Sequence, residues 1–351
     1  MRGLITIFSF LLIGVLTAFY IGFGLQESRE PRAIDMELEG LNEKYLLRFS
    51  HVVAENTPKG IAASMFAQLV REKTDGWVEV QVFPNAILYE AQDEFDALMS
   101  NDIHIIAPAL SEVTVLDPRW LVMDLPYVFQ DEQMVETAFN GKIGELLFES
   151  IEEYGLHGIA YWDNSFKQFT NNVRPVVVPE DIEGLTVRVM PSDALIDTYR
   201  ALGAWTRLFP FNEVYDVLST GIIDGTENTL SNIYSKGFYR QQKYMTLSNH
   251  NYLGYAVFMN RDYWDSIPVD YQNSIIEAMD EVTLWLRDHS KVINEEMLNR
   301  IKNSGQVEIH YQTEAERSLW KQSFKPIYEK YGRIIGEELM KEVIKLQEAT
   351  P

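Results

Sequence analysis

An arginine interrupts a regular strand pattern near the middle of the chain. In residues 184–193 (GLTVRVMPSD), apolar side chains at every second position predict a strand, and Arg188 lies with Met190 on the opposite face. A guanidinium in such a place either binds an anion or forms surface ion pairs, which stabilise a protein little. The residue therefore raises the question of an anionic ligand, and the stretch by itself leaves both interpretations open.

Residues that could carry catalytic chemistry show no recognisable arrangement. The sequence has no GxSxG, HExxH, phosphate-loop or Gly-rich dinucleotide motif, and it contains no cysteine. We therefore predict no catalytic residue, no metal and no cofactor, and an enzyme acting on a carboxylic acid is the alternative class. None of the histidines lies at metal-ligand spacing from another: His51, His104, His157, His250, His289 and His310.

Charge and composition limit the partners. The chain has 351 residues, 46% of them hydrophobic, which is enough for one large or two medium domains. Its 30 Lys and Arg residues against 52 Asp and Glu residues give a net charge of -22. This balance argues against a nucleic acid or an anionic membrane surface as the main partner, although a local site can still bind an anion.

The elements before residue 165 alternate between strand and helix. Residues 45–53, 77–84 and 103–110 read as strands, and residues 57–76 and 90–102 read as helices. The first helix is well marked, because Thr57 is a plausible N-cap and Pro58 fits the first helical position. The alternation predicts an α/β fold with a largely parallel sheet.

The rest of the chain repeats the alternation and then becomes helical. Residues 156–164 and 185–190 read as strands, and residues 192–203 and 211–225 as helices that end in glycine-containing turns. Residues 269–305 and 315–349 have apolar residues at helical spacing, and their charges read as solvated faces.

The first 25 residues predict a membrane anchor or a signal segment. Arg2 precedes an apolar run from Leu4 to Leu25, and at about 1.5 Å per residue such a helix spans roughly 33 Å. The length of the run favours an uncleaved anchor over a cleaved signal peptide, which stays the alternative. Either interpretation places the following chain outside the cytoplasm. Residues 26–44 are polar and predict a tether.

Several long blocks resemble the DctP family, the substrate-binding proteins of TRAP-type transporters. They follow the order and spacing of that family from about Phe49 to the C-terminus. The blocks are LRFSHVVAENTPKG, MDLPYVF, AYWDNSFKQFTNN, LTVRVMPSD, FNEVYDVLSTGIIDGTENTLSNIYSKGFY and LSNHNYLGYAVFMN. They resemble the C4-dicarboxylate branch, and the N-terminal segment resembles a Gram-positive subset that works with a dicarboxylate sensor kinase and carrier.

The resemblance implies a two-lobed, periplasmic-binding-protein-like clamp of type II, with a hinge and a long bridging helix. Residues 45–164 plus about 254–293 would form lobe I. Residues 165–253 plus about 294–347 would form lobe II. The chain would therefore cross between the lobes more than once.

The resemblance also implies the ligand-binding residues. Arg188 would grip a ligand carboxylate, Asn228 would brace the same carboxylate, and Lys167 would be a second cation. Lys59, in the first turn of its helix, would suit the far carboxylate, although a solvated lysine is the alternative. The remaining predicted contacts are Ser111, Met190, Phe211 and Asn232, for which a turn serine or a core residue is the alternative.

One departure from the family pattern concerns the loop that contains Ser111. That loop often has a lysine after the serine, whereas this sequence has Glu112. We expect the acidic residue to shift the ligand preference.

The expected function is a receptor for C4-dicarboxylates such as succinate, fumarate and malate, and another organic or sugar acid is the alternative ligand. The receptor would act outside the cytoplasm, held by its N-terminal helix or released after signal cleavage. Its expected partner is a membrane permease, a dicarboxylate sensor histidine kinase, or both, and no nucleic acid.

Overall fold

The computed structural model describes residues 44–349. The predicted anchor, residues 1–25, and the predicted tether up to residue 43 lie outside these described residues. Among the helices of residues 44–349, none has the length and apolar character that a membrane crossing requires.

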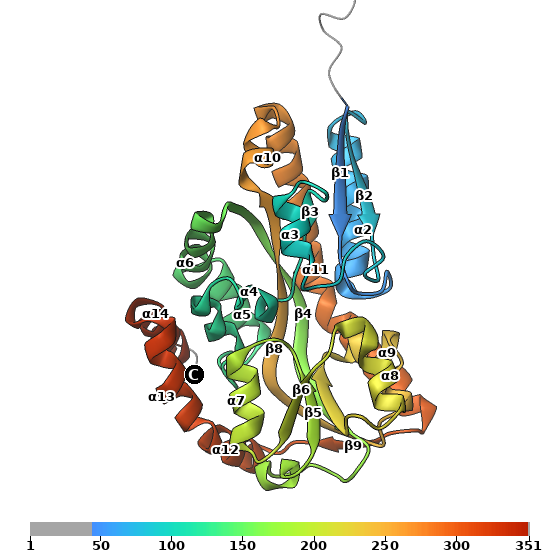
Figure 1. The fold of residues 1–351 in the computed structure, drawn as a ribbon, viewed down its shortest axis with the longest axis vertical. Coiled ribbons are helices and arrows are strands. Elements are labelled where there is room, and N and C mark those ends of the chain that lie inside the picture. The colour runs from blue at the N-terminus through green and yellow to red at the C-terminus, as the bar shows by residue number, and fades with distance from the viewer. Residues whose placement is uncertain (1–43, 350–351) are drawn as a thin grey trace, which may run out of the picture. The chain divides into compact units, whose positions relative to one another are not determined.

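One mixed sheet runs through the described chain (Figure 1). Its strand order is β2-β1-β3-β8-β4-β7-β5-β6, and β9 pairs with β8. The strands are β1 (Tyr45–Ser50), β2 (Val78–Phe83), β3 (Ile105–Ile106), β4 (Leu156–Asn171), β5 (Thr186–Val189), β6 (Trp205–Leu208), β7 (Gly225–Asn228), β8 (Tyr244–Asn260) and β9 (Glu308–Tyr311).

The centre of the sheet differs from the expected parallel arrangement. β1 pairs in parallel with β2 and β3, and β5 pairs in parallel with β6 and β7, as the alternation predicted. β4 and β8 pair antiparallel with each other, and β3 and β7 pair antiparallel with β8 and β4. β4 and β8 are 16 and 17 residues long and lie at the centre of the sheet, and their direction follows from the connectivity of the chain. We call the part of the molecule at the β1–β3 end of the sheet the first half, and the part at the β5–β7 end the second half.

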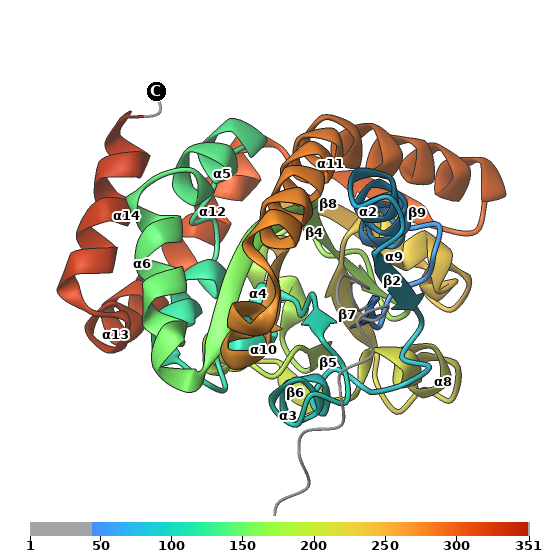
Figure 2. The ribbon, with the colours of Figure 1, turned by 90° about the horizontal axis from the view of Figure 1, so that it is seen from above.

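Helices cover both faces of this sheet (Figure 2). The α-helices are α2 (Pro58–Lys73), α3 (Glu94–Met99), α4 (Leu110–Val113), α5 (Glu132–Phe139), α6 (Lys142–Ile151), α7 (Asp193–Ala201), α8 (Val214–Ser219), α9 (Leu230–Ser235), α10 (Arg261–Ser266), α11 (Val269–Ser304), α12 (Glu314–Ser323), α13 (Lys325–Ile335) and α14 (Glu337–Ala349). Short 3₁₀ helices include η1 (Pro118–Asp124) and η4 (Phe211–Glu213).

The start of α2 follows the signals in its sequence. Thr57 is the N-cap, and its hydroxyl accepts a hydrogen bond from the Gly60 backbone N–H at 3.3 Å while donating to the Ala54 carbonyl at 2.7 Å. A Cβ on Gly60 would lie 2.3 Å from the Ala54 carbonyl oxygen, so only glycine permits this close approach. The loop and the first turn of α2 therefore hold each other in place, which confirms the predicted helix start.

The long helix α11 connects the two halves. It has 36 residues and packs against α2 in the first half, against β4, and against α9 in the second half. Its buried positions recur at helical spacing and include Ile275, Val282 and Leu286. The bridging helix that the resemblance implied is therefore present.

The C-terminal helical run divides into three helices. Pro326 lies in the first turn of α13, and Gly336 adopts φ +103°, a conformation that continues no α-helix. α13 packs on η1 and also contacts α7, and α14 packs on α5 and α6 (Figure 1). These helices thus contact elements from both predicted lobes, and the lobe boundaries stay a prediction.

Candidate ligand-binding cavity

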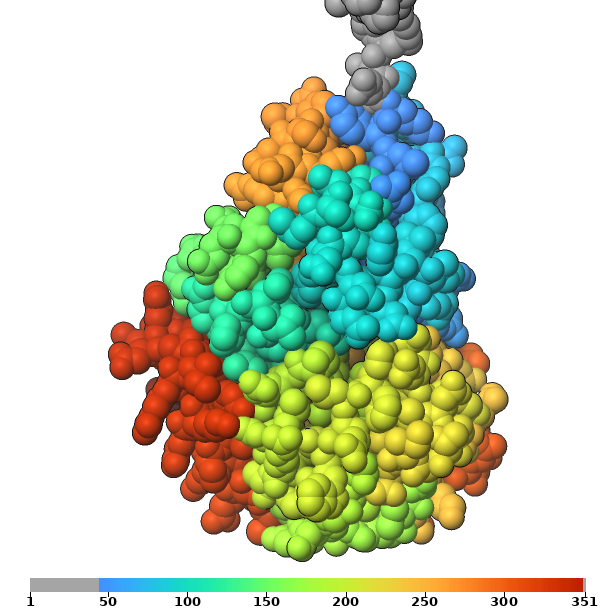
Figure 3. All heavy atoms as spheres, viewed as in Figure 1, coloured from blue at the N-terminus to red at the C-terminus, as the bar shows by residue number. Residues whose placement is uncertain are grey.

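A cavity lies between residues of the first and second halves of the sheet. The space there that no protein atom fills is about 440 Å³, including space that opens to solvent. In Figure 3 the blue and teal atoms of the first half meet the yellow-green and yellow atoms of the second half along a seam across the front. The lining residues are Val52, Val53, Lys59, Ala91, Glu94, Pro108, Ala109, Glu112, Arg188, Met190, Phe211, Asn228, Asn232, Leu253 and Tyr255.

Arg188 reaches the cavity from β5, between β6 and β7. The side chain is 2% exposed, so the interpretation as a solvated surface arginine is wrong. Its Nε and Nη2 atoms donate to the Phe209 carbonyl oxygen at 3.0 and 2.9 Å. A guanidinium has five N–H bonds, and the other three find no partner among the described residues. Those donors are available to an anion in the cavity.

Lys59 enters the same cavity from the first turn of α2. Its Nζ atom donates to the Ala107 carbonyl oxygen at 2.7 Å and lies 3.9 Å from the centre of the Tyr255 ring. The side chain is buried rather than solvated, and burial lowers its pKa, which Glu94 and Glu112 oppose. Lys59 and Arg188 thus reach one cavity from opposite halves of the molecule.

Two asparagines follow Arg188 in the second half. Asn228 ends β7, and its Oδ1 atom accepts hydrogen bonds from the Thr229 N–H and from Asn232 Nδ2, both at 2.9 Å. Because this oxygen is occupied, Asn228 presents its N–H donors to the cavity. Asn232 lies on α9. No described residue donates a hydrogen bond to its buried Oδ1 atom.

Two carboxyl groups also line the cavity. Glu94 begins α3 and accepts a hydrogen bond from Ser50 Oγ at 2.8 Å, and Glu112 lies in α4. Burial raises the pKa of Glu94, although Lys59 and Ser50 oppose this. Burial raises the pKa of Glu112 to about 7, although Arg188 opposes this. Sequence reasoning noticed Glu112 as a departure and overlooked Glu94.

Apolar side chains complete the lining. Met190 and Phe211, which were expected as walls, both line the cavity, together with Leu253 and Val53. Tyr255 was missed by sequence reasoning. It lies in a continuously buried part of β8, where nothing in the sequence separates a cavity residue from a core residue.

Two predicted contacts, Lys167 and Ser111, do not line the cavity. Ser111 Oγ donates to Asp124 Oδ1 at 2.5 Å, and its neighbour Glu112 faces the cavity instead. Lys167 Nζ lies 2.8 Å from Glu227 Oε1, and both side chains are buried. The ligand roles proposed for these two residues stay predictions.

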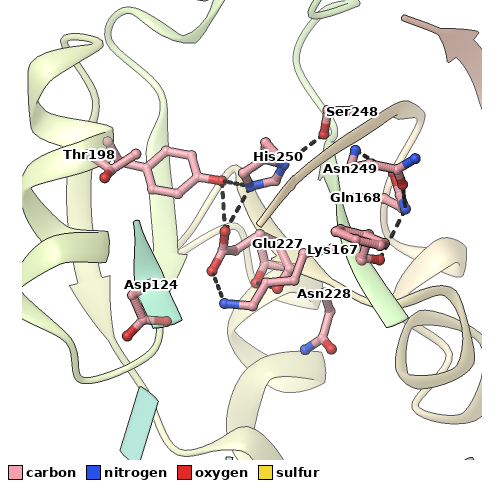
Figure 4. Close-up of polar contacts among 12 residues, drawn as sticks. Asp124, Lys167, Gln168, Thr198, Glu227, Asn228, Ser248, Asn249 and His250 are labelled. Atoms are coloured by element: carbon pink, nitrogen blue, oxygen red, sulfur yellow. Dashed lines mark hydrogen bonds and ion pairs between the residues drawn. The ribbon is translucent and has the colours of Figure 1, made fainter. Parts of the chain in front are cut away.

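The partner of Lys167 belongs to a buried polar network (Figure 4). Glu227 Oε2 lies 2.9 Å from His250 Nε2 and accepts from the Tyr199 hydroxyl at 3.2 Å. Ser248 Oγ lies 2.7 Å from His250 Nδ1. Burial acts to raise the pKa of Glu227, but Lys167 and His250 lower it to about 2. The network holds β4, β7 and β8 together next to Asn228.

Hydrogen bonds cross the seam around the cavity. Thr114 Oγ1 donates to the Pro191 carbonyl oxygen at 3.3 Å, and Asn212 Nδ2 donates to Glu90 Oε1 at 3.2 Å. The two halves are therefore in direct contact beside the cavity.

No group of three His, Asp or Glu side chains within residues 44–349 is arranged to hold a metal ion. The cavity is lined by two cations, two carboxyl groups of raised pKa, amide donors and apolar side chains, and the cations with the amide donors can bind an organic anion.

Comparisons with known proteins agree with this description. The family model described as "Bacterial extracellular solute-binding protein, family 7" (DctP) matches residues 49–333. The chain is 40% identical to the C4-dicarboxylate-binding protein DctB of Bacillus subtilis, over 99% of each chain. It is 37% identical to the C4-dicarboxylate-binding periplasmic protein DctP of Rhodobacter capsulatus, over 87% of this chain and 92% of the relative.

A solved structure shares the fold. A TRAP periplasmic solute-binding protein from Sulfurospirillum deleyianum, solved with bound succinate, superposes with a TM-score of 0.84 at 38% identity. The match covers 87% of this chain and 99% of that one.

Proposed function

Because the chain belongs to the DctP family of bacterial extracellular solute-binding proteins, we propose that it is a receptor for C4-dicarboxylates such as succinate, fumarate and malate. The observation that carries this proposal is the pair of buried cations, Arg188 and Lys59, that line one cavity from opposite halves of the molecule. The names of the relatives from Bacillus subtilis and Rhodobacter capsulatus support the same ligand class.

The physical argument begins with desolvation. A dicarboxylate that enters a closed cavity loses water from two charges, and each charge needs fixed donors or a cation in its place. Arg188 with Asn228 meets one carboxylate, and Lys59 meets the other. Met190 and Phe211 enclose the short carbon chain between them.

Ligand binding also explains how the molecule acts without chemical turnover. The family consists of receptors rather than enzymes. A ligand that contacts both halves stabilises the closed arrangement by its differential affinity for that arrangement. We assign residues 45–164 and about 254–293 to one lobe, and residues 165–253 and about 294–347 to the other, joined by β4, β8 and α11.

The closed surface would be recognised by a membrane protein. Membership in the family favours a TRAP permease as that partner, and a dicarboxylate sensor histidine kinase is the second candidate. Crosslinking of the protein in its own membrane distinguishes the two, because a permease and a kinase differ in mass and sequence. Recovery of neither partner contradicts this part of the proposal.

A binding screen tests the ligand. The full-length chain is heated with C4-dicarboxylates, with sugar acids and with simple keto acids. A ligand stabilises the folded form by RT ln(1 + [L]/Kd), so a C4 diacid is expected to raise the Tm more than the other acids. No shift with any C4 diacid would contradict the proposal.

The N-terminal segment has its own test. We propose that residues 1–25 hold the receptor at the outer face of the cell membrane. The prediction is that the protein fractionates with membranes at full length. A soluble form that begins near Gly22 would show cleavage instead.

A further inference from the structure

The ionisable groups that line the cavity have balanced charges. Lys59 and Arg188 contribute one positive charge each, and Glu94 and Glu112 contribute one negative charge each when ionised. The formal sum is therefore zero, whereas a C4-dicarboxylate that has lost both protons carries two negative charges. A cavity with both carboxyl groups protonated would carry the matching charge of plus two.

The two carboxyl groups are not neutralised by ion pairs. Among residues 44–349, no Lys or Arg nitrogen lies within 4.0 Å of a carboxylate oxygen of Glu94 or Glu112. Within residues 44–349, Ser50 is the only residue whose side chain donates to the Glu94 carboxyl group, and no side chain donates to that of Glu112. Both side chains are nonetheless buried, with exposed fractions of 1% and 9%. An unpaired buried carboxylate is costly, and proton uptake removes that cost.

The surroundings of Glu112 contain charges of both signs at longer range. Arg188 on β5, Lys59 on α2 and Lys167 on β4 favour its ionised form, and Asp124 in η1 disfavours it. Lys167 is already paired with Glu227, and Arg188 donates to the Phe209 carbonyl group. The Tyr255 hydroxyl of β8 donates no hydrogen bond to Glu112.

The surroundings of Glu94 are similar. Lys59 and the Ser50 hydroxyl favour its ionised form, and Glu112 disfavours it. His51 adds no positive charge, because burial and the nearby Lys59 lower its pKa to about 3. A dianionic ligand would add two like charges to this group of residues, which favours the protonated carboxyl groups further.

We infer that the cavity takes up protons on Glu112 and Glu94 when it binds a dicarboxylate dianion, so that the two carboxyl groups donate hydrogen bonds while Arg188 and Lys59 supply the charge. This inference rests on the proposed function and specifies the ionic form in which that ligand is bound. The raised pKa of each carboxyl group in the ligand-free protein supports it, because burial alone already favours the proton.

The pH dependence follows from the sign of this linkage. Well below pH 7 Glu112 already holds its proton in the free protein, since its pKa is raised to about 7, and binding at this residue takes up none. Above that value the free carboxyl is ionised and must gain a proton, so the affinity falls as the pH rises. The expected loss is about tenfold per pH unit for each proton taken up.

Titration calorimetry measures the protons directly. Succinate is titrated into the full-length chain at pH 7.5 in two buffers with different ionisation enthalpies, and Kd is measured from pH 6.5 to 8.5. The wild type is expected to take up roughly half a proton or more per ligand, with Kd rising over this range. Glu112→Gln and Glu94→Gln are each expected to lower the proton number and flatten the rise in Kd.

Glu180→Gln is the matched control, because Glu180 is exposed and lies outside the cavity lining. It is expected to keep the proton number and the pH dependence of the wild type. Succinate binding with no proton uptake and a constant Kd would overturn the inference while leaving the proposed function intact. Unchanged uptake in both glutamine variants would overturn the assignment to Glu112 and Glu94. Binding of no C4 diacid at any pH would instead contradict the proposed function, and the inference with it.

Discussion

Lys167 lies in different surroundings from those that the sequence motif predicted. As a cation on the family motif, it was expected to face the ligand, whereas the structure pairs it with Glu227 in a fully buried network. A buried ion pair is costly to break, because the remaining partner keeps an uncompensated charge. We infer that Lys167 contributes to the site by fixing β7, which carries Asn228 next to Glu227.

Replacement of Lys167 distinguishes the two roles. Lys167→Met is expected to lower the free energy of unfolding by about 3–5 kcal/mol, because the buried Glu227 carboxylate loses the ammonium group at its Oε1 atom. Urea unfolding measures this loss, and the double variant Lys167→Met/Glu227→Leu is expected to recover part of it. Lys345→Met is the control, since the pair of Lys345 with Glu342 is exposed and its loss should change stability much less. Unchanged stability with lost ligand affinity would instead assign Lys167 to the ligand.

The residues of the cavity were predictable to different degrees. Arg188, Asn228, Met190, Phe211, Asn232 and Lys59 stand in or next to long motif blocks, and all of them line the cavity. Glu94 and Tyr255 were missed, because an acidic residue at a helix start and a tyrosine in an apolar strand are ordinary outside a cavity. The spacing of residues along the sequence does not determine how side chains pack. It therefore cannot tell which of several nearby polar residues faces a ligand.

At the scale of elements, the first turn of α2 positions Lys59 at the cavity. Thr57 caps the helix two residues earlier, and Gly60 allows the preceding loop to approach the helix closely. The position of the Lys59 ammonium group over Tyr255 therefore depends on the geometry of this helix start.

Removal of the cap tests that dependence. Thr57→Ala is expected to cost about 0.5–2 kcal/mol of stability, because the Gly60 N–H loses its partner. It should also weaken dicarboxylate binding, since the first turn carries Lys59. Thr313→Ala is the matched control, because Thr313 caps α12 through a capping box and lies outside the cavity lining. Equal effects of the two variants on Kd would contradict a special role for the α2 start.

The elements themselves were predictable where local signals agreed with tertiary packing. The start of α2 matched its cap signals, and the long helix α11 matched its apolar spacing. The central antiparallel pair of β4 and β8 was not foreseen, since strand direction follows from chain connectivity rather than from residue alternation. Gly336 also divided a run that apolar spacing alone had joined.

At the scale of the whole molecule, the two halves touch across the cavity. The hydrogen bonds from Thr114 to Pro191 and from Asn212 to Glu90 join them at the seam. Hydrogen bonds of this kind stabilise such an arrangement only modestly. A ligand that bridges Arg188 and Lys59 would therefore have a large influence on the balance between open and closed forms.

Solution scattering measures this balance. The ligand-free protein is expected to have a larger radius of gyration than the protein saturated with succinate, because the halves separate when no anion holds the two cations. Asn212→Ala should leave this ligand-induced decrease in place, since its contact with Glu90 lies on the exposed rim. An identical radius with and without ligand would contradict closure.

The most direct test of a dicarboxylate receptor is the affinity of an Arg188 variant. Calorimetric titration of succinate into Arg188→Ala is expected to show a loss of about 2–5 kcal/mol, on the order of 30- to several-thousand-fold in Kd, because a buried carboxylate loses its charge partner. Arg207→Ala, on the neighbouring strand β6 and exposed, should bind as the wild type does. A Kd for Arg188→Ala within about threefold of the wild-type value would contradict the role of this cavity in binding the ligand.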